Sequence, residues 1–294
     1  MDHEKFDLSG KFDLSGKVAI VIGATKGMGL TIAHQFAASG AKVVVSSRTA
    51  TEAEALASTL SERYGNATTI AVAKGGDMTV KSDLQAIVDT AIESFGKITT
   101  LVVSPTIRPW FGPTINTPDD EIDTQFLYVF KARFWITSMC IPHMARAGGG
   151  SAVYIGSGSA FEASSERSIY ACMRSAEVRL IQNFAAEHGR NNIRFNIISP
   201  GLIDAHGSKS LFEDMATVAQ ITAGLPMRRH GETSEISAAV TFLASDASSF
   251  TTGAVVPVDG GRLLHAVPSR LTDAFADEQA ARLATTSKAN ESTP

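Results

Sequence analysis

The sequence predicts an α/β fold in which helices cover both faces of a parallel sheet, and three observations support this. Short apolar runs alternate with helical patterns along most of the 294 residues, which is the rhythm of β-α-β units. Several runs are unbroken rather than alternating, as in strands buried on both faces. A glycine-rich turn follows the first run and opens the first helix, which is typical of a doubly wound, Rossmann-type sheet.

The predicted sheet has about seven strands in a single domain. The strand-like runs are residues 18–22, 42–46, 68–73, 98–103, 151–156, 193–198 and 254–258. The helical patterns are residues 28–39, 50–64, 79–95, 119–147, 168–189 and 233–245. Right-handed crossovers make consecutive strands parallel, so ligands should bind at the shared edge formed by their carboxyl ends.

The N-terminus stands apart from this pattern. The hexapeptide Lys-Phe-Asp-Leu-Ser-Gly occurs at residues 5–10 and again at 11–16, as a duplication would produce. We therefore expect residues 1–11 to be a duplicated or disordered extension and residues 12–262 to form the domain.

Two other segments carry weaker signals. Residues 263–294 are expected to form a C-terminal extension, helical over 269–284 and disordered over the polar stretch 287–294. Residues 200–231 break the strand-helix rhythm after a Pro-Gly pair. They are expected to form either a lid or substrate loop, or a plain long connection.

Composition argues against several classes of partner. The net charge of -4 indicates no affinity for nucleic acid or an anionic membrane. The apolar runs are too short to cross a bilayer, and the first residues lack the apolar core of a secretory signal. The two cysteines, Cys140 and Cys172, have no metal-ligand spacing. We expect a cytoplasmic protein with no metal site that acts on a small molecule.

The stretch from Val18 to Gly29 predicts a phosphate-binding turn. Its glycines follow the pattern G-x-x-x-G-x-G between a strand and a helix. Glycine allows positive φ and close approach of a pyrophosphate, while the helix N-terminus offers N–H groups and a positive dipole end. An ordinary connection is the alternative. The predicted cofactor contacts in this turn are Gly23, Thr25, Lys26, Gly27, Met28 and Gly29.

The residue after the second predicted strand indicates which nucleotide is bound. Arg48 lies nineteen residues after Gly29, and no Asp or Glu stands at 45–48. In such units an acid at this place binds the ribose 2′-hydroxyl, whereas an arginine suits a 2′-phosphate. Lys26 is a second candidate cation. We therefore favour NADP(H) over NAD(H), against the alternative that Arg48 is merely a solvated residue.

Asp77 follows the third predicted strand and has two interpretations. It is a candidate hydrogen-bond acceptor for the adenine amino group, with Met78 beside it in the cofactor site. Alternatively, Asp77 caps a helix that begins at Thr79.

A serine, a tyrosine and an arginine form the candidate catalytic group. Ser157 ends a predicted strand, and Tyr170 opens a predicted helix with Arg174 four residues later on the same helix face. A tyrosine phenol has a pKa of about 10, and a nearby permanent cation moves that pKa toward neutrality. The serine hydroxyl would hold the substrate oxygen. In the alternative, Ser157 is a turn residue and Tyr170 a packed aromatic.

Together these motifs resemble the short-chain dehydrogenase/reductase superfamily over about residues 12–262. The resemblance rests on the turn Gly23-Ala-Thr-Lys-Gly-Met-Gly29 and on a serine thirteen residues before the tyrosine. Ser199-Pro200-Gly201 and the late Gly253-Ala-Val-Val-Pro-Val-Asp-Gly-Gly261 also match.

The resemblance implies an NADP(H)-dependent oxidoreductase that interconverts a carbonyl and an alcohol. Tyr170 would be the acid/base, and Ser157 would orient the reacting oxygen. Tyr170 and Arg174 would contact the cofactor, and Pro200, Gly201 and Ile203 would line the nicotinamide. The resemblance also implies a homo-oligomer, a homotetramer or a dimer.

Three departures from the family pattern stand at the site. The family has lysine where this chain has Arg174, and Asn-Asn-Ala-Gly where this chain has Val103-Ser-Pro-Thr106. It also has an asparagine where this chain has about Val129. The family lysine passes a proton through a water held by that asparagine. Arginine keeps its proton at neutral pH, so the usual proton relay is expected to be absent.

The Ser-Tyr-Arg set is also similar to the halohydrin dehalogenases, a branch of the superfamily that works without nucleotide. In that alternative Tyr170 deprotonates a haloalcohol, and Trp110 and Phe111 wall the halide pocket. Equally, these two aromatics would cap the sheet edge or line an aromatic substrate site. A third class is a catalytically silent nucleotide-binding protein. The intact glycine turn, Arg48 and Asp259-Gly-Gly261 favour the oxidoreductase. The aromatics at 110, 111 and 161 hint at a bulky or apolar substrate.

Overall fold

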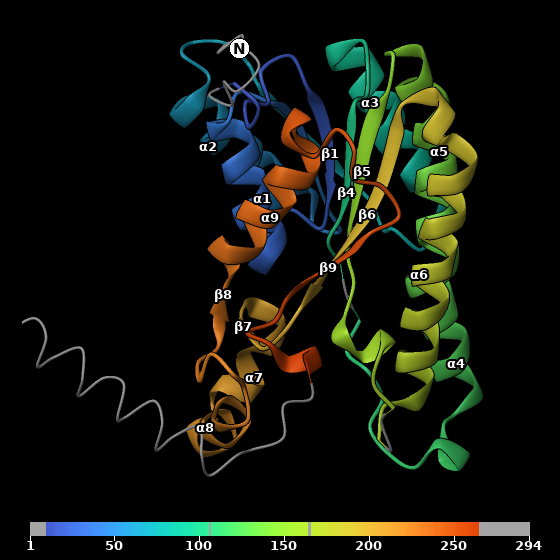
Figure 1. Ribbon diagram of the computed structural model, residues 1–294. Helices are drawn as coiled ribbons and strands as arrows, with labels where there is room; N and C mark the ends of the chain where they lie inside the picture. Colours follow the sequence, from blue (N-terminus) through green and yellow to red (C-terminus); the bar gives the residue numbers. More distant parts are fainter. Residues whose placement is uncertain (1–9, 106, 164–165, 265–294) are drawn as a thin grey trace, which may run out of the picture.

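The computed structural model describes residues 10–105, 107–163 and 166–264 (Figure 1). Within these ranges, no helix is long and apolar enough to cross a membrane. The expected C-terminal helix and the polar end of the chain lie outside the described residues, as do residues 1–9, which include most of the first copy of the N-terminal hexapeptide.

One seven-stranded parallel sheet organises the chain, as predicted. Its order is β3-β2-β1-β4-β5-β6-β9, in which the direction of strand addition reverses between β1 and β4 as in doubly wound folds. The strands are β1 (Val18–Ile22), β2 (Lys42–Ser47), β3 (Ala71–Gly75), β4 (Thr100–Val103), β5 (Gly150–Ile155), β6 (Ile193–Pro200) and β9 (Val255–Val258).

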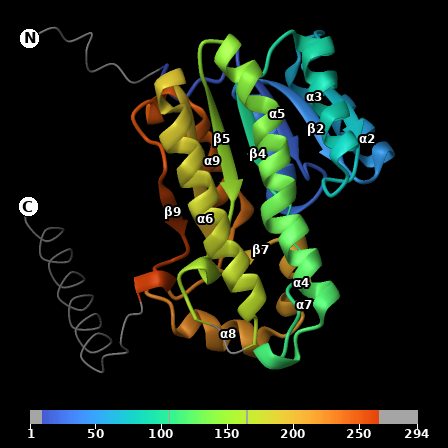
Figure 2. The same cartoon turned by 90° about the vertical axis from the view of Figure 1, so that its right-hand side faces the viewer.

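Helices cover both faces of the sheet (Figure 1, Figure 2). On one face lie α1 (Gly27–Ala38), α2 (Ala50–Tyr64) and α9 (Thr233–Ala244), and on the other lie α3 (Lys81–Phe95), α5 (Ala132–Arg146) and α6 (Ser168–His188). The helix α4 (Asp119–Gln125) continues into α5 through a π-helical segment, η3 (Phe126–Lys131). The short 3-10 helices are η2 (Thr114–Asn116), η4 (Gly158–Ala160), η5 (Gly189–Asn191), η6 (His206–Ser208), η7 (Asp246–Ser248) and η8 (Arg262–Leu264).

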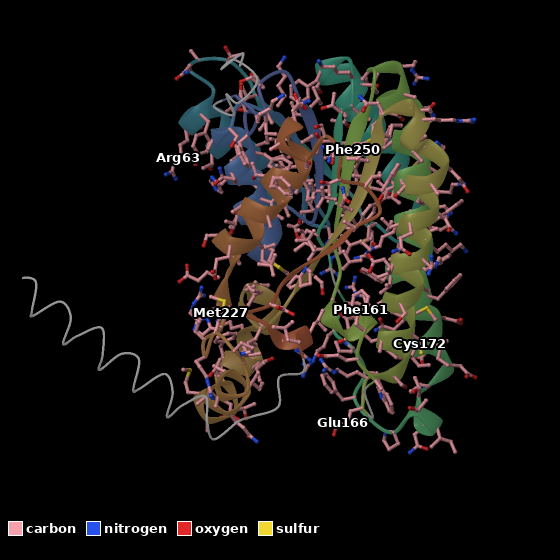
Figure 3. All side chains as sticks on the ribbon, in the orientation of Figure 1. Arg63, Phe161, Glu166, Cys172, Met227 and Phe250 are labelled. Atoms are coloured by element: carbon pink, nitrogen blue, oxygen red, sulfur yellow. The ribbon has the colours of Figure 1, made fainter. Side chains whose placement is uncertain are left out.

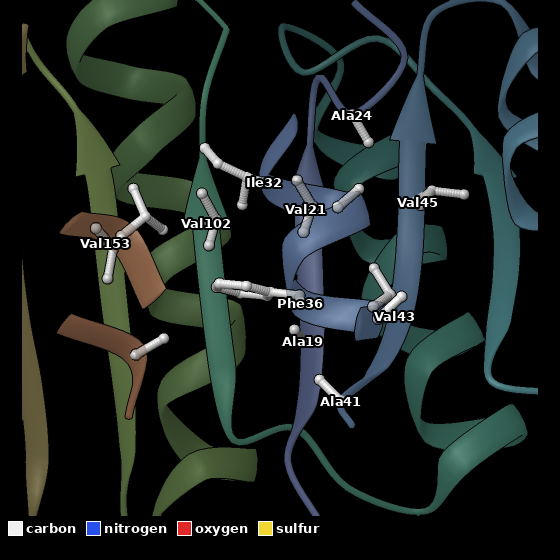
Figure 4. Packing of buried hydrophobic residues seen from close by; sticks show 14 of the residues in the cluster. Ala19, Val21, Ala24, Ile32, Phe36, Ala41, Val43, Val45, Val102 and Val153 are labelled. Carbon is white, nitrogen blue, oxygen red and sulfur yellow. The ribbon is translucent and has the colours of Figure 1, made fainter. Parts of the chain in front are cut away.

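Apolar periodicity explains how the elements pack. All five residues of β1 are buried, because helices lie on both sides of it. In α1, Ile32 and Phe36 lie one turn apart and contact the sheet near Val21 and Val102 (Figure 4). Burying a side chain of this size stabilises the fold by roughly 1.5–3 kcal/mol. The glycine turn is thereby fixed between two well-packed elements.

The segment 200–231, expected to be a lid or substrate loop or a plain long connection, contains four short helices and strands in addition to η6. They are β7 (Ile203–Asp204), α7 (Lys209–Phe212), α8 (Met215–Ala223) and β8 (Gly231–Glu232), with β7 and β8 paired in parallel. Only Val218 of α8 is buried, so the helix lacks the apolar periodicity that would have revealed it. The side chain of Asp214 accepts hydrogen bonds from its first N–H groups, which stabilises its start.

Several predicted boundaries also differ from the structure by two residues or more, since β4 begins at Thr100 rather than at residue 98 and β6 extends to Pro200 rather than to residue 198. The third strand is shifted toward the C-terminus, from 68–73 to β3, because Thr68 and Thr69 are polar loop residues. The helix predicted from residue 79 begins at Lys81, with Val80 as its N-cap.

Candidate active site

The glycine turn joins β1 to α1 at the carboxyl edge of the sheet. Gly23 and Gly27 have φ values of +76° and +55°, a region that favours glycine. A Cβ on Gly29 would lie 2.0 Å from the carbonyl oxygen of Gly23. Lys26, the N-cap of α1, makes no side-chain cap hydrogen bond, which leaves the first helical N–H groups for an anion. The turn therefore fits a dinucleotide pyrophosphate.

The segment after β7 lies against this turn. A Cβ on Gly27 would be 3.5 Å from the backbone nitrogen of His206 and 3.7 Å from the Cβ of Ala205. The connection that was expected to be a lid or a plain loop therefore contacts the candidate phosphate site.

Arg48 and Lys26 have different surroundings beside the glycine turn. Arg48 follows β2 directly and is exposed. Lys26 Nζ lies 2.9 Å from Glu52 Oε1, and its hydrogen bond lowers the pKa of Glu52. Thr25 donates hydrogen bonds to Ser47 and to Glu52. Since Lys26 is engaged by Glu52, Arg48 is the better candidate for a ribose 2′-phosphate.

Asp77 and Met78 follow β3 as predicted, but Asp77 does not cap a helix at Thr79. Its Oδ1 accepts hydrogen bonds from the backbone N–H and the hydroxyl of Thr79, both at 2.8 Å, which forms a turn before α3. Met78 is buried. The Asp77 N–H donates to Asp83 of α3. The acid thus shapes the loop at the edge where adenine would lie.

Tyr170 and Ser157 both lie beyond the carboxyl end of β5. Tyr170 is the third residue of α6 and is 9% exposed, so its side chain is packed at the margin of the site. Ser157 stands two residues after β5 rather than at its end, and its Oγ accepts a hydrogen bond from the Ser159 N–H at 3.2 Å. That bond uses an oxygen lone pair and leaves the hydroxyl proton for a substrate oxygen.

Arg174 lies directly behind Tyr170. Its guanidinium carbon is 5.1 Å from the Tyr170 ring centroid, and the two side chains share a hydrogen bond. Arg174 also donates to the Ile155 carbonyl at 3.2 Å. Burial alone would lower the pKa of Arg174, but Tyr170 and Glu177 raise it above its ordinary value. The guanidinium therefore stays charged.

The burial of Arg174 alters one sequence-based expectation. The side chain is fully buried, so in this conformation it has no exposed surface to offer a nicotinamide ribose. The i, i+4 spacing did bring Arg174 to Tyr170. The geometry favours a role behind the phenol over a role as a cofactor ligand.

Two charged residues that the sequence analysis did not select complete this region. Glu177 Oε2 lies 2.8 Å from Arg174 Nη1, and Glu177 Oε1 lies 2.6 Å from Arg133 Nε. Both Arg133 and Glu177 are buried. One signal was present in the sequence: Tyr170, Arg174 and Glu177 fall on one helix face at i, i+4 and i+7.

The two other departures from the family pattern lie next to these charges. Val129, at the place of the family asparagine, is fully buried within η3. Pro105 packs on the glycine turn, since a Cβ on Gly23 would be 2.6 Å from its Cγ. The Pro105 carbonyl accepts a hydrogen bond from Arg133 at 2.7 Å. Arg133 therefore links the loop after β4 to the charges behind Tyr170.

Pro200, Gly201 and Ile203 lie at the end of β6 and just beyond it. Pro200 pairs with Val258 of β9, and Ile203 is buried. A Cβ on Gly201 would lie 2.6 Å from the Cα of Asp259, so only glycine lets the two segments approach. These residues lie at the same edge of the sheet as the glycine turn.

A small cavity opens in front of Tyr170. It has a volume of about 10 Å³ and is lined by Trp110, Thr117, Glu121, Gln125, Ser168, Ile169 and Tyr170. Gln125 is buried and its Nε2 donates to Glu121. Its Oε1 has no hydrogen-bond partner in the described part of the chain. This void, between α4 and α6, has room for about one water-sized group, so it marks one edge of the candidate substrate subsite and does not hold a whole substrate.

The segment between β5 and α6 is tied to the end of the described chain. Arg262 of η8 donates two hydrogen bonds to the carboxylate of Glu162, at 2.7 and 3.2 Å. Phe161, beside Glu162, is half-exposed and extends from the same segment (Figure 3). This pair holds the segment that connects Ser157 to Tyr170.

Comparison with known proteins identifies the family. A family model described as "Enoyl-(Acyl carrier protein) reductase" matches residues 23–262. The chain belongs to the short-chain dehydrogenase/reductase superfamily. It is 36% identical to dehydrogenase/reductase SDR family member 4 of Oryctolagus cuniculus over 255 residues, which cover 87% of this chain and 95% of that protein. The Homo sapiens protein of the same name is 34% identical, and the match covers 87% of this chain and 88% of that protein.

Solved structures with similar folds carry nucleotides of both kinds. A 7α-hydroxysteroid dehydrogenase in complex with NADH and 7-oxo glycochenodeoxycholic acid is 32% identical, with a TM-score of 0.80, and 86% of this chain and 96% of that chain are covered. L-Sorbose reductase from Gluconobacter frateurii in complex with NADPH and L-sorbose is 25% identical, with a TM-score of 0.79. The match covers 86% of this chain and 98% of that chain.

Proposed function

We propose that the protein is an NADP(H)-dependent oxidoreductase that interconverts a carbonyl and an alcohol, with Tyr170 as the acid/base. The observation that carries the proposal is the placement of Tyr170 against the Arg174 guanidinium, at the sheet edge that holds the glycine turn. When bound there, the nicotinamide would supply or accept the hydride.

The residues of the chain would bind the cofactor, orient the substrate oxygen and transfer the proton. The turn from Gly23 to Gly29 binds the pyrophosphate, and Arg48 pairs with the 2′-phosphate. Ser157 donates a hydrogen bond to the reacting oxygen. In reduction Tyr170 gives its proton to the developing alkoxide, and in oxidation it removes the alcohol proton. Arg174 stabilises the phenolate that remains after proton transfer.

The nucleotide preference rests on this chain's own residues. The similar solved structures include one with NADH and one with NADPH, so they support a nicotinamide cofactor without choosing between the two. The exposed arginine after β2 favours NADP(H), as does the lack of an acid at residues 45–48.

Titration calorimetry with NADPH and NADH tests the cofactor, and NADPH consumption over a panel of ketones and aldehydes tests the reaction. We expect tighter binding of NADPH and turnover of at least one carbonyl. Tyr170→Phe should abolish turnover and leave nucleotide affinity unchanged. Failure to bind either nucleotide would overturn the proposal, and retained turnover in Tyr170→Phe would remove the tyrosine from the mechanism.

A second candidate is a dehalogenase without nucleotide, which the buried Arg174 and Val129 favour because they replace the residues of the family's proton relay. Bromide release from a vicinal bromoalcohol in the absence of nucleotide would support this function. If nucleotide binds and neither reaction occurs, the protein is a catalytically silent nucleotide-binding member of the superfamily.

A further inference from the structure

Three fully buried charges meet behind the candidate acid/base. Glu177 of α6 lies between Arg174 of the same helix and Arg133 of α5, at 2.8 Å and 2.6 Å. Removing three charged groups from water is costly, and apolar side chains of similar volume often stabilise a protein equally well or better. The network is therefore hard to explain by stability alone.

The network carries a net charge of +1. This charge lies beside the Tyr170 ring, where it can stabilise a phenolate. Arg174 contacts the phenol ring directly. Glu177 alone would cancel the charge of Arg174, but Arg133 compensates for Glu177. Burial lowers the pKa of Arg133, while the Glu177 carboxylate favours the charged form. Tyr170 and Arg133 also interact electrostatically.

Arg133 is held in place by backbone atoms. Its Nη1 donates to the Tyr128 carbonyl at 2.5 Å and its Nη2 donates to the Pro105 carbonyl at 2.7 Å. The guanidinium is thus fixed between η3 and the loop after β4. Arg174 is fixed in the same way by the Ile155 carbonyl of β5. Each arginine is therefore held by backbone carbonyls in addition to its contact with Glu177.

Other titratable groups surround Tyr170 on the elements packed against it. Tyr154 of β5 and Cys140 of α5 are buried, and burial raises the pKa of Tyr154 well above its ordinary value and that of Cys140 to about 12. Both stay neutral near pH 7. Glu121 of α4 lines the cavity in front of Tyr170, and Arg167 precedes α6. Arg133, Arg174 and Glu177 are the buried charges behind the phenol among the residues that the structure describes.

We propose that Arg133 and Glu177 are positioning residues that fix the Arg174 guanidinium against Tyr170 and maintain one net positive charge behind its phenol. Glu177 orients Arg174, and Arg133 neutralises Glu177. This arrangement would replace the electrostatic part of the family's lysine and asparagine by a dry ion network. Proton exchange with solvent would then occur on the cavity side of Tyr170. The inference rests on the proposed function for the role of Tyr170.

The sign of each charge gives opposite predictions for two variants. Arg133→Met leaves the Glu177 charge uncompensated beside Arg174, so the titration midpoint of Tyr170 should rise by about one pH unit or more. Glu177→Gln removes the negative charge, so the midpoint should fall. The double variant restores a net charge of +1 and should return the midpoint close to that of the parent.

The measurement is carbon-13 NMR of the full chain labelled at tyrosine Cζ. The protein has 4 tyrosines, and the signal missing from Tyr170→Phe assigns Tyr170. Arg133→Lys, which keeps the charge, should leave the midpoint nearly unchanged. Arg194→Met is the matched control, because Arg194 of β6 is partly buried and donates hydrogen bonds to Ser248 of η7 and to the Ser245 carbonyl at the end of α9.

Opposite shifts in the two single variants, with recovery in the double variant, would support the proposal. Shifts in the same direction, or no shift, would overturn it, because a purely structural network is disturbed alike by either change. If Arg133→Met does not fold, Glu177→Gln decides alone: a fall supports the proposal, and a rise or no change refutes it.

The readout needs neither nucleotide nor turnover, so the two proposals fail separately. If the midpoints shift as expected but no nucleotide binds, the proposed function is wrong and the network stands. If carbonyl reduction is found and the midpoints do not shift, the function stands and the network is only structural. If both proposals are supported, the pH profile of kcat/KM should shift in each variant in the same direction as the NMR midpoint of Tyr170.

Discussion

At the residue scale, the proposed nucleotide site and the proposed substrate site each contain one group whose environment leads to a test. Arg48 is exposed beside the glycine turn, while Lys26 is engaged by Glu52. In front of Tyr170, the Gln125 Oε1 is buried without a hydrogen-bond partner among the described residues. Each group makes a prediction that a single substitution tests.

Arg48→Glu should reverse the nucleotide preference. The substitution removes a cation that pairs with the 2′-phosphate and places an acid where the ribose 2′-hydroxyl would be recognised. A charge-assisted hydrogen bond contributes about 1.5–3 kcal/mol, so NADPH affinity should fall at least about tenfold while NADH affinity holds or rises. Calorimetry with both nucleotides measures this, with Arg63→Glu as a surface control. Equal losses for the two nucleotides would contradict the assignment.

Gln125→Leu should separate stability from activity. A buried carbonyl oxygen without a partner costs about 1–3 kcal/mol, and its removal offsets the loss of the Nε2–Glu121 hydrogen bond, so the melting temperature should change little. If Oε1 accepts a hydrogen bond from a substrate hydroxyl, kcat/KM for hydroxylated carbonyl substrates should fall about tenfold or more. A matched substrate without the hydroxyl should be little affected. Equal effects on both substrates would exclude Gln125 from substrate recognition.

The sequence predicted the pairing of Tyr170 with Arg174 better than it predicted the surroundings of that pair. The i, i+4 spacing placed Arg174 against Tyr170, and the glycine spacing placed the turn. The depth of Arg174 was not predictable, because its burial depends on Glu177 and on Arg133 from another helix. Pairing across α5 and α6 is a tertiary property that spacing along the chain does not contain.

At the element scale, local patterns predicted the strands and long helices but missed elements without a buried stripe. The β1 and α1 residues are apolar at the positions that the sheet buries, so their periodicity was informative. In contrast, α8 buries only Val218. The π-helical η3 lay inside one predicted helix, since its extra residue per turn leaves little trace in composition.

The segment between β5 and α6 gives a prediction at this scale. Arg262→Ala breaks the two hydrogen bonds to Glu162 and should loosen the connection between Ser157 and Tyr170. We expect KM for the carbonyl substrate to rise several-fold and kcat to change less, because the loop shapes the pocket and does not perform the chemistry. Steady-state kinetics tests this. Glu162→Gln should give a smaller effect, and a loss confined to kcat would contradict the assignment.

At the scale of the whole molecule, the sheet brings residues that are distant in sequence to one edge. The glycine turn, Ser157 and the β6 end are separated by more than a hundred residues in places, and the parallel topology alone places them together. The outer faces of α5 and α6 lie side by side on one side of the molecule (Figure 2). There, Phe134 of α5 is 43% exposed and stacks on Phe184 of α6, with 5.9 Å between the ring centroids.

We predict that this face contacts a second copy of the chain, as expected from the resemblance to oligomeric enzymes. Light scattering after size exclusion should give the mass of a dimer or tetramer. Phe134→Asp should lower that mass, because an unpaired charge cannot be buried in an apolar contact. Phe12→Asp, which alters a half-exposed ring that packs on Phe242 of α9, on the opposite face of the sheet, is the control. A monomeric parent protein would refute the prediction.

The ion network between α5 and α6 also bears on how the protein folds. If α6 were to dock on the sheet before α5, Glu177 would face an apolar surface without Arg133. If α5 docked first, Arg133 would be stranded in the same way. Half-assembled intermediates are therefore disfavoured, and the two helices should unfold in a single cooperative step with matching hydrogen-exchange protection.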